Sequence, residues 1–138
     1  MKKVFILFLI ISNIFAYSLK EFLTCEDVKN LTPINPTKFF YLSKNKKVYA
    51  FAYFKDIKTP FKIKIRWKKF NKKDKKWYII SQINLNIKSG IRWRTFAYIT
   101  LKPYSIGLWK VELINKKNSK IIDTKYFSVD KNLTAVKI

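Results

Sequence analysis

The sequence predicts an all-β protein, and three observations support this prediction. Apolar and polar residues alternate with a period of two over most of the chain, which is the pattern of half-buried strands. Short polar segments interrupt this alternation about every ten residues. The alternating segments are rich in β-branched and aromatic residues, which favour extended backbone. Together these features predict an antiparallel, immunoglobulin-like β-sandwich of about seven strands, with a partly open barrel as the alternative.

The 138-residue chain begins with a segment that is typical of a secretory signal. Lys2 and Lys3 precede an apolar run over residues 4–11, and Ala16 is a small residue of the kind that signal peptidases accept. The run is shorter than the roughly 20 residues that cross a bilayer. We therefore expect a cleaved signal peptide over residues 1–16, with an uncleaved anchor as the alternative. The mature chain would then have no transmembrane segment, and the protein would be exported, periplasmic or attached to the cell envelope.

The sequence after this segment predicts one β-sandwich domain over residues 17–130 and a loose tail over residues 131–138. Residues 19–30 are the one stretch that could form a short helix. Residues 24–42 contain two prolines and could add an edge strand, where proline is tolerated. Cys25 is the only cysteine, so it cannot form an internal disulfide; it is either buried or available to a partner thiol.

Six strong strands follow along the chain, separated by polar turns such as NKKDKK and NKKNSK. Their expected ranges are 47–54, 61–70, 77–88, 91–101, 108–114 and 121–129. The strand over 61–70 directs its apolar residues inward and its cations outward, the latter being Lys62, Lys64, Arg66 and Lys68. In the strand over 77–88 we expect Ile83, Leu85 and Ile87 to point inward.

Charge is the strongest compositional signal. Lys and Arg total 30 against 8 for Asp and Glu, which gives a formal net charge of +22. An AT-rich coding bias would raise lysine, but it would also raise glutamate, so it does not explain the imbalance. Such a charge attracts anionic surfaces whatever the fold.

The sequence contains few of the residues and motifs that catalysis requires. The chain has no histidine, which excludes Ser-His and Cys-His dyads and metal sites built on imidazole. The carboxylates are scattered, and only Glu26 and Asp27 are adjacent. Glycine-rich phosphate loops are absent, since the chain has 2 glycines. We therefore expect no enzyme activity, no cofactor and no metal.

Only three of the cations are arginines, and each is adjacent to a tryptophan: Arg66 precedes Trp67, and Arg92 and Arg94 flank Trp93. One interpretation is architectural, in which an arginine of residues 92–94 holds Glu112 across strands or lies flat on Phe96 or Tyr98. The other makes the three arginines a fork for a ligand carboxylate or phosphate. The two interpretations differ in whether Glu112 occupies the arginine.

The tryptophans predict a core and one exposed ring. Trp67, Trp93 and Trp109 fall on the apolar sides of their strands, so we expect them to pack inside. Trp77 adjoins the lysine-rich turn, where an exposed indole could serve as a binding platform.

The order of four short motifs resembles a bacterial domain-of-unknown-function family. The motifs are Trp67, RWRT at 92–95, GLWKVEL at 107–113, and a last strand ending F-x-V at 127–129. The resemblance covers residues 25–129 and implies an exported or envelope-attached domain with no assigned activity, which is often the C-terminal part of longer chains. Family members commonly have a histidine before the first tryptophan and a glycine in the last hairpin; this chain has neither, so a role of that histidine would not transfer.

Two function classes remain open. The first is a non-catalytic module that binds an anionic envelope polymer or a membrane surface, without specific nucleic-acid recognition. The second is a structural domain that binds an envelope protein and has no small ligand. Lysines gathered on one sheet face would favour the first class, and an even coat of charge the second. The candidate binding residues are Arg66, Arg92, Arg94, Lys62, Lys64, Lys68 and Trp77.

Overall fold

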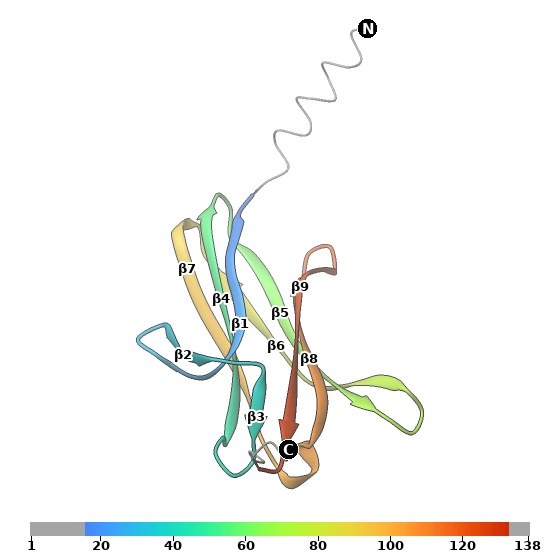
Figure 1. Cartoon of the computed structure of the whole chain (residues 1–138). Helices are drawn as coiled ribbons and strands as arrows, with labels where there is room; N and C mark the ends of the chain where they lie inside the picture. The colour runs from blue at the N-terminus through green and yellow to red at the C-terminus, as the bar shows by residue number, and fades with distance from the viewer. Residues whose placement is uncertain (1–15, 133–138) are drawn as a thin grey trace, which may run out of the picture.

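The computed structural model describes residues 16–132 and contains nine strands and one short 3₁₀ turn (Figure 1). The elements are β1 (Ser18–Lys29), β2 (Thr32–Pro36), β3 (Phe39–Tyr41), β4 (Lys47–Ile57), β5 (Phe61–Asn71), β6 (Lys76–Ile87), β7 (Gly90–Thr100), η1 (Pro103–Ser105), β8 (Gly107–Asn115) and β9 (Lys120–Asp130).

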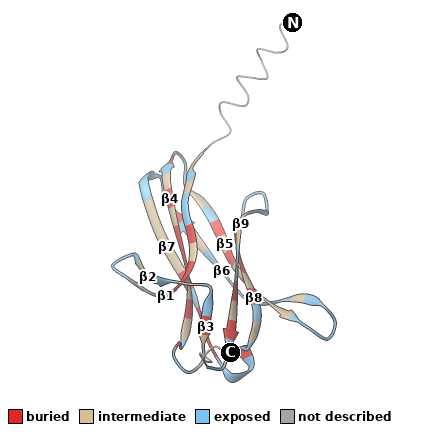
Figure 2. Ribbon diagram, in the orientation of Figure 1, coloured by how far each residue is buried: buried red, intermediate tan, exposed pale blue. Residues whose placement is uncertain are grey.

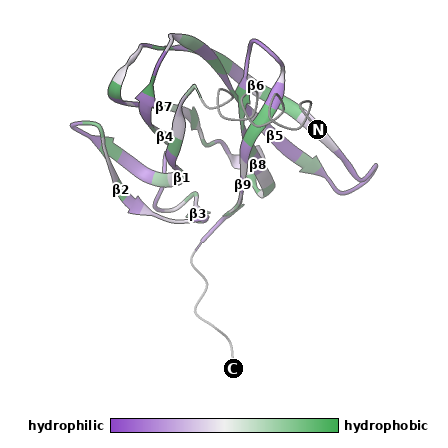
Figure 3. Ribbon diagram, turned by 90° about the horizontal axis from the view of Figure 1, so that it is seen from above, coloured by the Kyte–Doolittle hydropathy of each residue, from purple (hydrophilic) through white to green (hydrophobic). Residues whose placement is uncertain are grey.

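The strands form two sheets that face each other, as the view from above shows (Figure 3). The first sheet has the order β2-β1-β4-β7, and the second has the order β3-β9-β8-β5-β6. Neighbours pair antiparallel except β3 and β9, which pair parallel over three residues. The predicted all-β, antiparallel sandwich is therefore confirmed, with nine strands in place of about seven.

The extra strands come from the N-terminal third of the chain. The helical alternative for residues 19–30 is wrong, because this stretch is β1 and pairs with β2 on one side and β4 on the other. The predicted edge strand over residues 24–42 is confirmed by β2, which contains Pro33 and Pro36 and lies at the edge of its sheet. Because β1 has a neighbour on each side, tertiary pairing outweighs its weak helical pattern.

The core fills the space between the sheets (Figure 2). Trp67 and Trp109 are buried as expected, and both rings contact Phe127, with centroid distances of 5.9 Å and 5.8 Å. The indole Nε1 of Trp109 donates a hydrogen bond to the carbonyl oxygen of Ser105 at 2.7 Å, so its polar atom is satisfied. Trp93 is half-buried and packs against the same core. The opposite sheet contributes small side chains to this cluster, which leave room for the indoles: Ala50, Ala52 and Ala97.

The edge strand β6 departs from the expected burial. Ile87 is buried and Leu85 is half-buried, but 46% of Ile83 is exposed. The inward direction of Ile83 follows from its pairing with the buried Ile65 of β5. Its exposure arises because β6 is the last strand of its sheet, so no further strand covers its outer side.

The two lysine-rich turns are built alike. In each, an asparagine side chain accepts a hydrogen bond from the backbone N–H two residues later: Asn71 from Lys73 at 2.9 Å, and Asn115 from Lys117 at 3.0 Å. A backbone N–H four residues later bonds to the carbonyl oxygen of the same asparagine in both turns. These local bonds explain how stretches rich in like charge still form compact hairpin turns.

Two predictions fall on residues that the structure does not describe. The signal peptide expected over 1–16 lies outside the described range except for residue 16, and the tail expected over 131–138 lies outside it except for residues 131 and 132. Within residues 16–132, no helix has the length and apolarity that a membrane span requires.

Cys25 is fully buried in β1, and its thiol donates a hydrogen bond to the carbonyl oxygen of Asp27 at 3.2 Å. Burial raises the pKa of this thiol from 9.0 to about 11, because an apolar environment disfavours the thiolate. Of the two possibilities that the sequence left open, the structure therefore supports a buried thiol.

We predict that Cys25 reacts with thiol reagents only when the protein unfolds. A pKa raised by about two units leaves roughly a hundredfold less thiolate at pH 8, and burial blocks access as well. Because the unfolded thiol ionises above pH 9 and the folded one does not until about 11, this group weakens stability between those pH values and has no effect below them. Stopped-flow labelling with a chromogenic disulfide, with and without denaturant, measures the difference. Complete labelling of the native protein within seconds would contradict the prediction.

Candidate functional site

Cations from two adjacent strands gather on the outer surface of the five-stranded sheet. Strands β5 and β8 pair antiparallel, so Arg66 lies opposite Glu112 and Lys68 lies opposite Lys110. Because alternate residues point to opposite faces, the side chains between the buried ones of β5 point outward. We call this surface the basic face and define it as Lys62, Lys64, Arg66, Lys68 and Lys110, with Glu112 among them.

Glu112 is the centre of the basic face. Only 3% of this residue is exposed, yet its carboxylate contacts three cations. The Nζ of Lys68 lies 3.2 Å from Oε1, the Nη1 of Arg66 lies 3.8 Å from Oε1, and the Nζ of Lys110 lies 4.0 Å from Oε2. Lys68 also donates a hydrogen bond of 3.4 Å to Oε2. One buried negative charge thus compensates cations from both strands and reduces their mutual repulsion.

The oxygens of Glu112 are not equally satisfied. Oε1 has ionic contacts with Arg66 and Lys68 but accepts no hydrogen bond from any described residue. Arg66 directs its Nε elsewhere, to the side-chain oxygen of Gln82 on β6 at 3.1 Å. Arg66 therefore bridges from β8 across β5 to β6, along one row of the sheet.

The predicted partner of Glu112 is corrected by this geometry. Arg92 and Arg94 do not hold Glu112, because they lie on β7 in the other sheet, whereas β8 pairs with β5 and β9. The arginine at Glu112 is Arg66. The three arginines also cannot form one fork for a ligand, because Arg66 lies on the outer surface of one sheet and the β7 pair lies on the outer surface of the other.

Arg94 instead lies over an aromatic ring. Its guanidinium carbon is 4.9 Å from the ring centroid of Tyr53, its neighbour in β4, and not on Phe96 or Tyr98 as the sequence interpretation proposed. The outer surface of the four-stranded sheet carries an aromatic row that is flanked by four cations, namely Lys47, Lys55, Arg92 and Arg94. Tyr49 contacts the rings of Phe96 and Tyr98 at centroid distances of 5.9 Å and 5.3 Å. The two outer surfaces of the sandwich therefore differ in chemistry.

Trp77 lies at the rim of the basic face and is half-buried rather than free. Its ring contacts Phe70 at 5.2 Å and Tyr126 at 6.0 Å, and the Nζ of Lys110 lies 4.4 Å from its centroid. Lys110 thus connects the aromatic rim to Glu112 by a cation–π contact and an ion pair. The period-two alternation of GLWKVEL would have indicated Lys110 as an outward cation, although it was not among the residues expected to bind.

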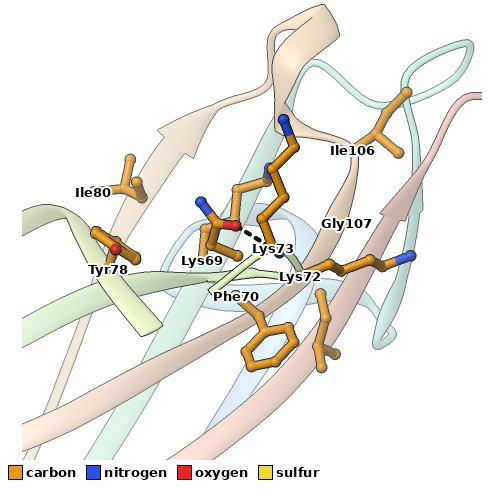
Figure 4. Close-up of a pocket in the computed structure, with 10 residues that line it drawn as sticks. Lys69, Phe70, Lys72, Lys73, Tyr78, Ile80, Ile106 and Gly107 are labelled. Carbon is orange, nitrogen blue, oxygen red and sulfur yellow. Dashed lines mark hydrogen bonds between the residues drawn. The ribbon is translucent and has the colours of Figure 1, made fainter. Parts of the chain in front are cut away.

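An open groove of about 630 Å³ lies at the β5–β6 hairpin, which projects beyond the rest of the sandwich (Figures 1 and 4). Its Lys69 lies opposite the inward Trp109 of β8, so this side chain points to the inner side of β5 and not to the basic face. Figure 4 shows Tyr78 and Ile80 on one side of the groove and Ile106 on the other. Three lysines also line the groove, namely Lys69, Lys72 and Lys73. Gly107 permits this arrangement, because a Cβ there would lie 3.3 Å from Cε of Lys69. Sequence reasoning missed this groove, because nothing local shows how far a hairpin projects.

The adjacent carboxylates Glu26 and Asp27 serve the fold. Glu26 accepts hydrogen bonds from Asn45 at 2.8 Å and Asn35 at 3.0 Å, and Lys44 lies 3.2 Å away. The bond from Asn45, followed by that from Lys44, lowers the pKa of Glu26. Asp27 accepts a hydrogen bond from the backbone N–H of Val28. Over the described part of the chain, no three residues of the types His, Cys, Asp and Glu gather in a group that could hold a metal ion.

The sequence matches one protein family. The profile of the family described as "Protein of unknown function (DUF2914)" matches residues 60–129, which contain nearly all of β5 to β9 and therefore the whole basic face. No curated protein matches the sequence.

Among solved structures, the chain is similar to the crystal structure of a β-glucosidase from Kluyveromyces marxianus in complex with glucose. The sequence identity is 11% and the TM-score is 0.47. The similarity covers 83% of this chain and 14% of the glucosidase chain, so this protein spans only a small part of that enzyme's length.

We predict that Glu112→Gln destabilises the fold by about 2–3 kcal/mol. The change leaves Arg66, Lys68 and Lys110 without their shared counter-charge; because these cations retain some solvent contact, the loss is smaller than for a wholly buried pair. Asp123→Asn is the matched control. Its carboxylate is 35% exposed and lies 3.8 Å from Lys125, so the change should cost less than about 1 kcal/mol. Urea unfolding of both variants measures the two losses, and equal losses would show that Glu112 has no special role.

Proposed function

The chain belongs to the DUF2914 family, whose function is unknown, and we propose that it is a non-catalytic module that binds anionic polymers of the cell envelope. The observation that carries this proposal is the basic face. Five cations project from one side of two neighbouring strands, and Glu112 is the one carboxylate among them.

The basic face has charge left for a ligand after its internal pairing. Glu112 can neutralise one unit of charge, although it contacts three cations. Lys62 and Lys64 form no ion pair with any described residue, and Lys62 is exposed. A polyanion that approaches this surface would replace the counterions around such lysines, and the release of those counterions favours binding.

The layout of the cations suits an extended polymer. Outward residues on one strand repeat about every 7 Å, so the row from Lys62 to Lys68 spans roughly 20 Å. The groove with Lys69, Lys72 and Lys73 is a separate cationic surface, because Lys69 points to the inner side of β5. The aromatic rim of Phe70, Trp77 and Tyr126 adds flat apolar area beside the charges. A row of cations without an enclosed pocket favours recognition of repeated negative charge over recognition of one small molecule.

The proposed location of the protein in the cell envelope rests on its N-terminal segment. A basic start, an apolar run and Ala16 in that order direct a chain to export, and the envelope of a bacterium presents acidic polysaccharides and anionic lipid headgroups. Both carry repeated anionic groups, so one basic face could bind either. Heparin, phosphatidylglycerol vesicles and a single-stranded oligonucleotide distinguish the sources in one assay.

We predict that heparin binding falls steeply between about 50 and 200 mM salt, and that this dependence arises from the basic face. The double variant Lys62→Gln, Lys64→Gln should lower the log–log salt slope by about 1.5, since two contacts are lost. Lys68 is left unchanged because it pairs with the buried Glu112, so its removal would also affect the fold. Isothermal titration at several salt concentrations gives the slope.

The control changes the same charge on the other sheet. Lys29→Gln with Lys55→Gln removes two lysines of β1 and β4, and neither has an ion-pair partner among the described residues. This variant should retain the slope of the parent. If both double variants reduce binding equally, net charge rather than the basic face is responsible. If the parent does not bind heparin, vesicles or oligonucleotide at low salt, the proposed function is wrong.

A further inference from the structure

Strand β6 is an unprotected edge of the five-stranded sheet. It pairs with β5 on one side and has no described strand on the other. Its side chains include four large apolar residues that are 45–54% exposed, namely Tyr78, Ile79, Ile80 and Ile83. An edge of this kind presents unpaired backbone N–H and C=O groups beside apolar side chains.

The other edges of the sandwich carry the usual protection. Strand β2 is short and contains Pro33 and Pro36, which cannot donate to a further ladder. Strand β7 carries Arg92 and Arg94. Strand β3, the other edge of the five-stranded sheet, has neither proline nor charge but is only three residues long, and the part of β9 that it does not cover contains Lys120, Asp123 and Lys125. Proline and charge both prevent a second strand from pairing.

Strand β6 has neither device along most of its length. From Trp77 to Ile87 it contains no charged residue and no proline, in a chain with 30 cations. Its one irregularity is a bulge at Ile80, because Ser81 pairs with Trp67 while Ile79 pairs with Lys68. Beyond the bulge, residues 81–87 (SQINLNI) pair with β5 in regular register and carry no charge.

We propose that two copies of this chain associate through residues 81–87 of β6, which pair antiparallel with the same residues of the second copy about a twofold axis. The two five-stranded sheets then form one continuous sheet. A second copy fits this edge because, about a twofold axis, residue i of one copy meets residue j of the other and j meets i, so an edge rich in cations would meet the same cations. The chain has a net charge of +22, and residues 81–87 of β6 contain no charged residue, so two copies can meet there without placing cations against cations.

The basic faces of the two copies would repel each other only weakly, because they lie far apart. Across such an interface, β5 of one copy lies three strand spacings from β5 of the other, or roughly 14 Å. This distance exceeds the Debye length of about 8 Å at physiological ionic strength. The lysines of the two basic faces are therefore largely screened from each other, and added salt should strengthen the association.

The symmetry also relates the two basic faces. Antiparallel pairing of two edge strands side by side requires the twofold axis to be perpendicular to the sheet, so both outer faces point the same way. The dimer would present two basic faces on one surface and could contact one long polymer twice. The dimer itself does not depend on the proposed polyanion binding, and its test contains no polyanion.

Sedimentation equilibrium of the mature chain tests the proposal. We expect a monomer–dimer equilibrium at concentrations up to about 0.5 mM, with a dimer that is tighter at about 500 mM salt than at about 50 mM. Polyanion binding should change with salt in the opposite direction, so the two proposals can fail separately. A monomer at every concentration and salt would overturn the dimer.

Three variants locate the interface. Ile83→Lys places a charge at the neutral edge and should weaken the dimer by roughly tenfold or more. Asn84→Glu also adds a charge to the edge, but the new carboxylate lies opposite Lys64 of β5 and can pair with it. This second variant should therefore stay folded and test the interface even if Ile83→Lys disturbs the fold. The control is Ile121→Lys on β9, where 53% of the isoleucine is exposed beside an edge that already has lysines.

The expected pattern is a weaker dimer in both β6 variants and an unchanged dimer in the control. Thermal unfolding confirms that each variant is folded. A dimer that both β6 variants retain, or that the control loses equally, would overturn the assignment to β6.

Discussion

The ion cluster at Glu112 is the constraint on which the arrangement of the five-stranded sheet depends. Its β5 and β8 strands lie side by side inside the sheet, and the outward residues of β5 are mostly cations, one of which, Lys68, lies opposite Lys110 of β8. Without a counter-charge, Lys68 and Lys110 would face each other as like charges across the ladder. Glu112 lies between these cations and is nearly inaccessible to water, so its attraction is screened less than that of a surface pair. A chain with few carboxylates therefore places one of them where three cations meet.

The arginines fit this constraint. Arg66 bonds to Gln82 on one side and contacts Glu112 on the other, a reach that a planar guanidinium with several donors provides and a single ammonium does not. Arg94 lies on Tyr53, where the flat guanidinium contacts the face of the ring. Each arginine precedes or follows a tryptophan because neighbouring strand residues point to opposite faces: the indole packs inward and the guanidinium lies outside. The guanidinium groups of Arg66 and Arg94 thus make contacts across strands, whereas Arg92 is exposed.

The sandwich consequently has two different outer surfaces and four different edges. One surface is basic around Glu112, and the other carries an aromatic row over Tyr49, Phe96 and Tyr98. The edges at β2 and β7 carry proline or charge. The edge at β3 is only three residues long and leaves the charged part of β9 uncovered, whereas β6 has none of these features from Trp77 to Ile87. The two proposals concern different elements: polyanion binding rests on the basic face, and self-association rests on the neutral edge at β6.

The amino-acid sequence by itself determined which side of each strand is apolar, because the alternation of side-chain direction is local and needs no knowledge of neighbouring strands. This is why the all-β class, the buried Trp67 and Trp109, and the outward lysines of β5 could be predicted. Only the tertiary structure decided which strands are neighbours, since pairing joins residues far apart in the chain. It made Arg66 rather than Arg92 or Arg94 the arginine at Glu112, and it made residues 19–30 a strand. It also left Ile83 exposed, because a period-two pattern shows the direction of a side chain but not whether its strand lies at the edge of a sheet.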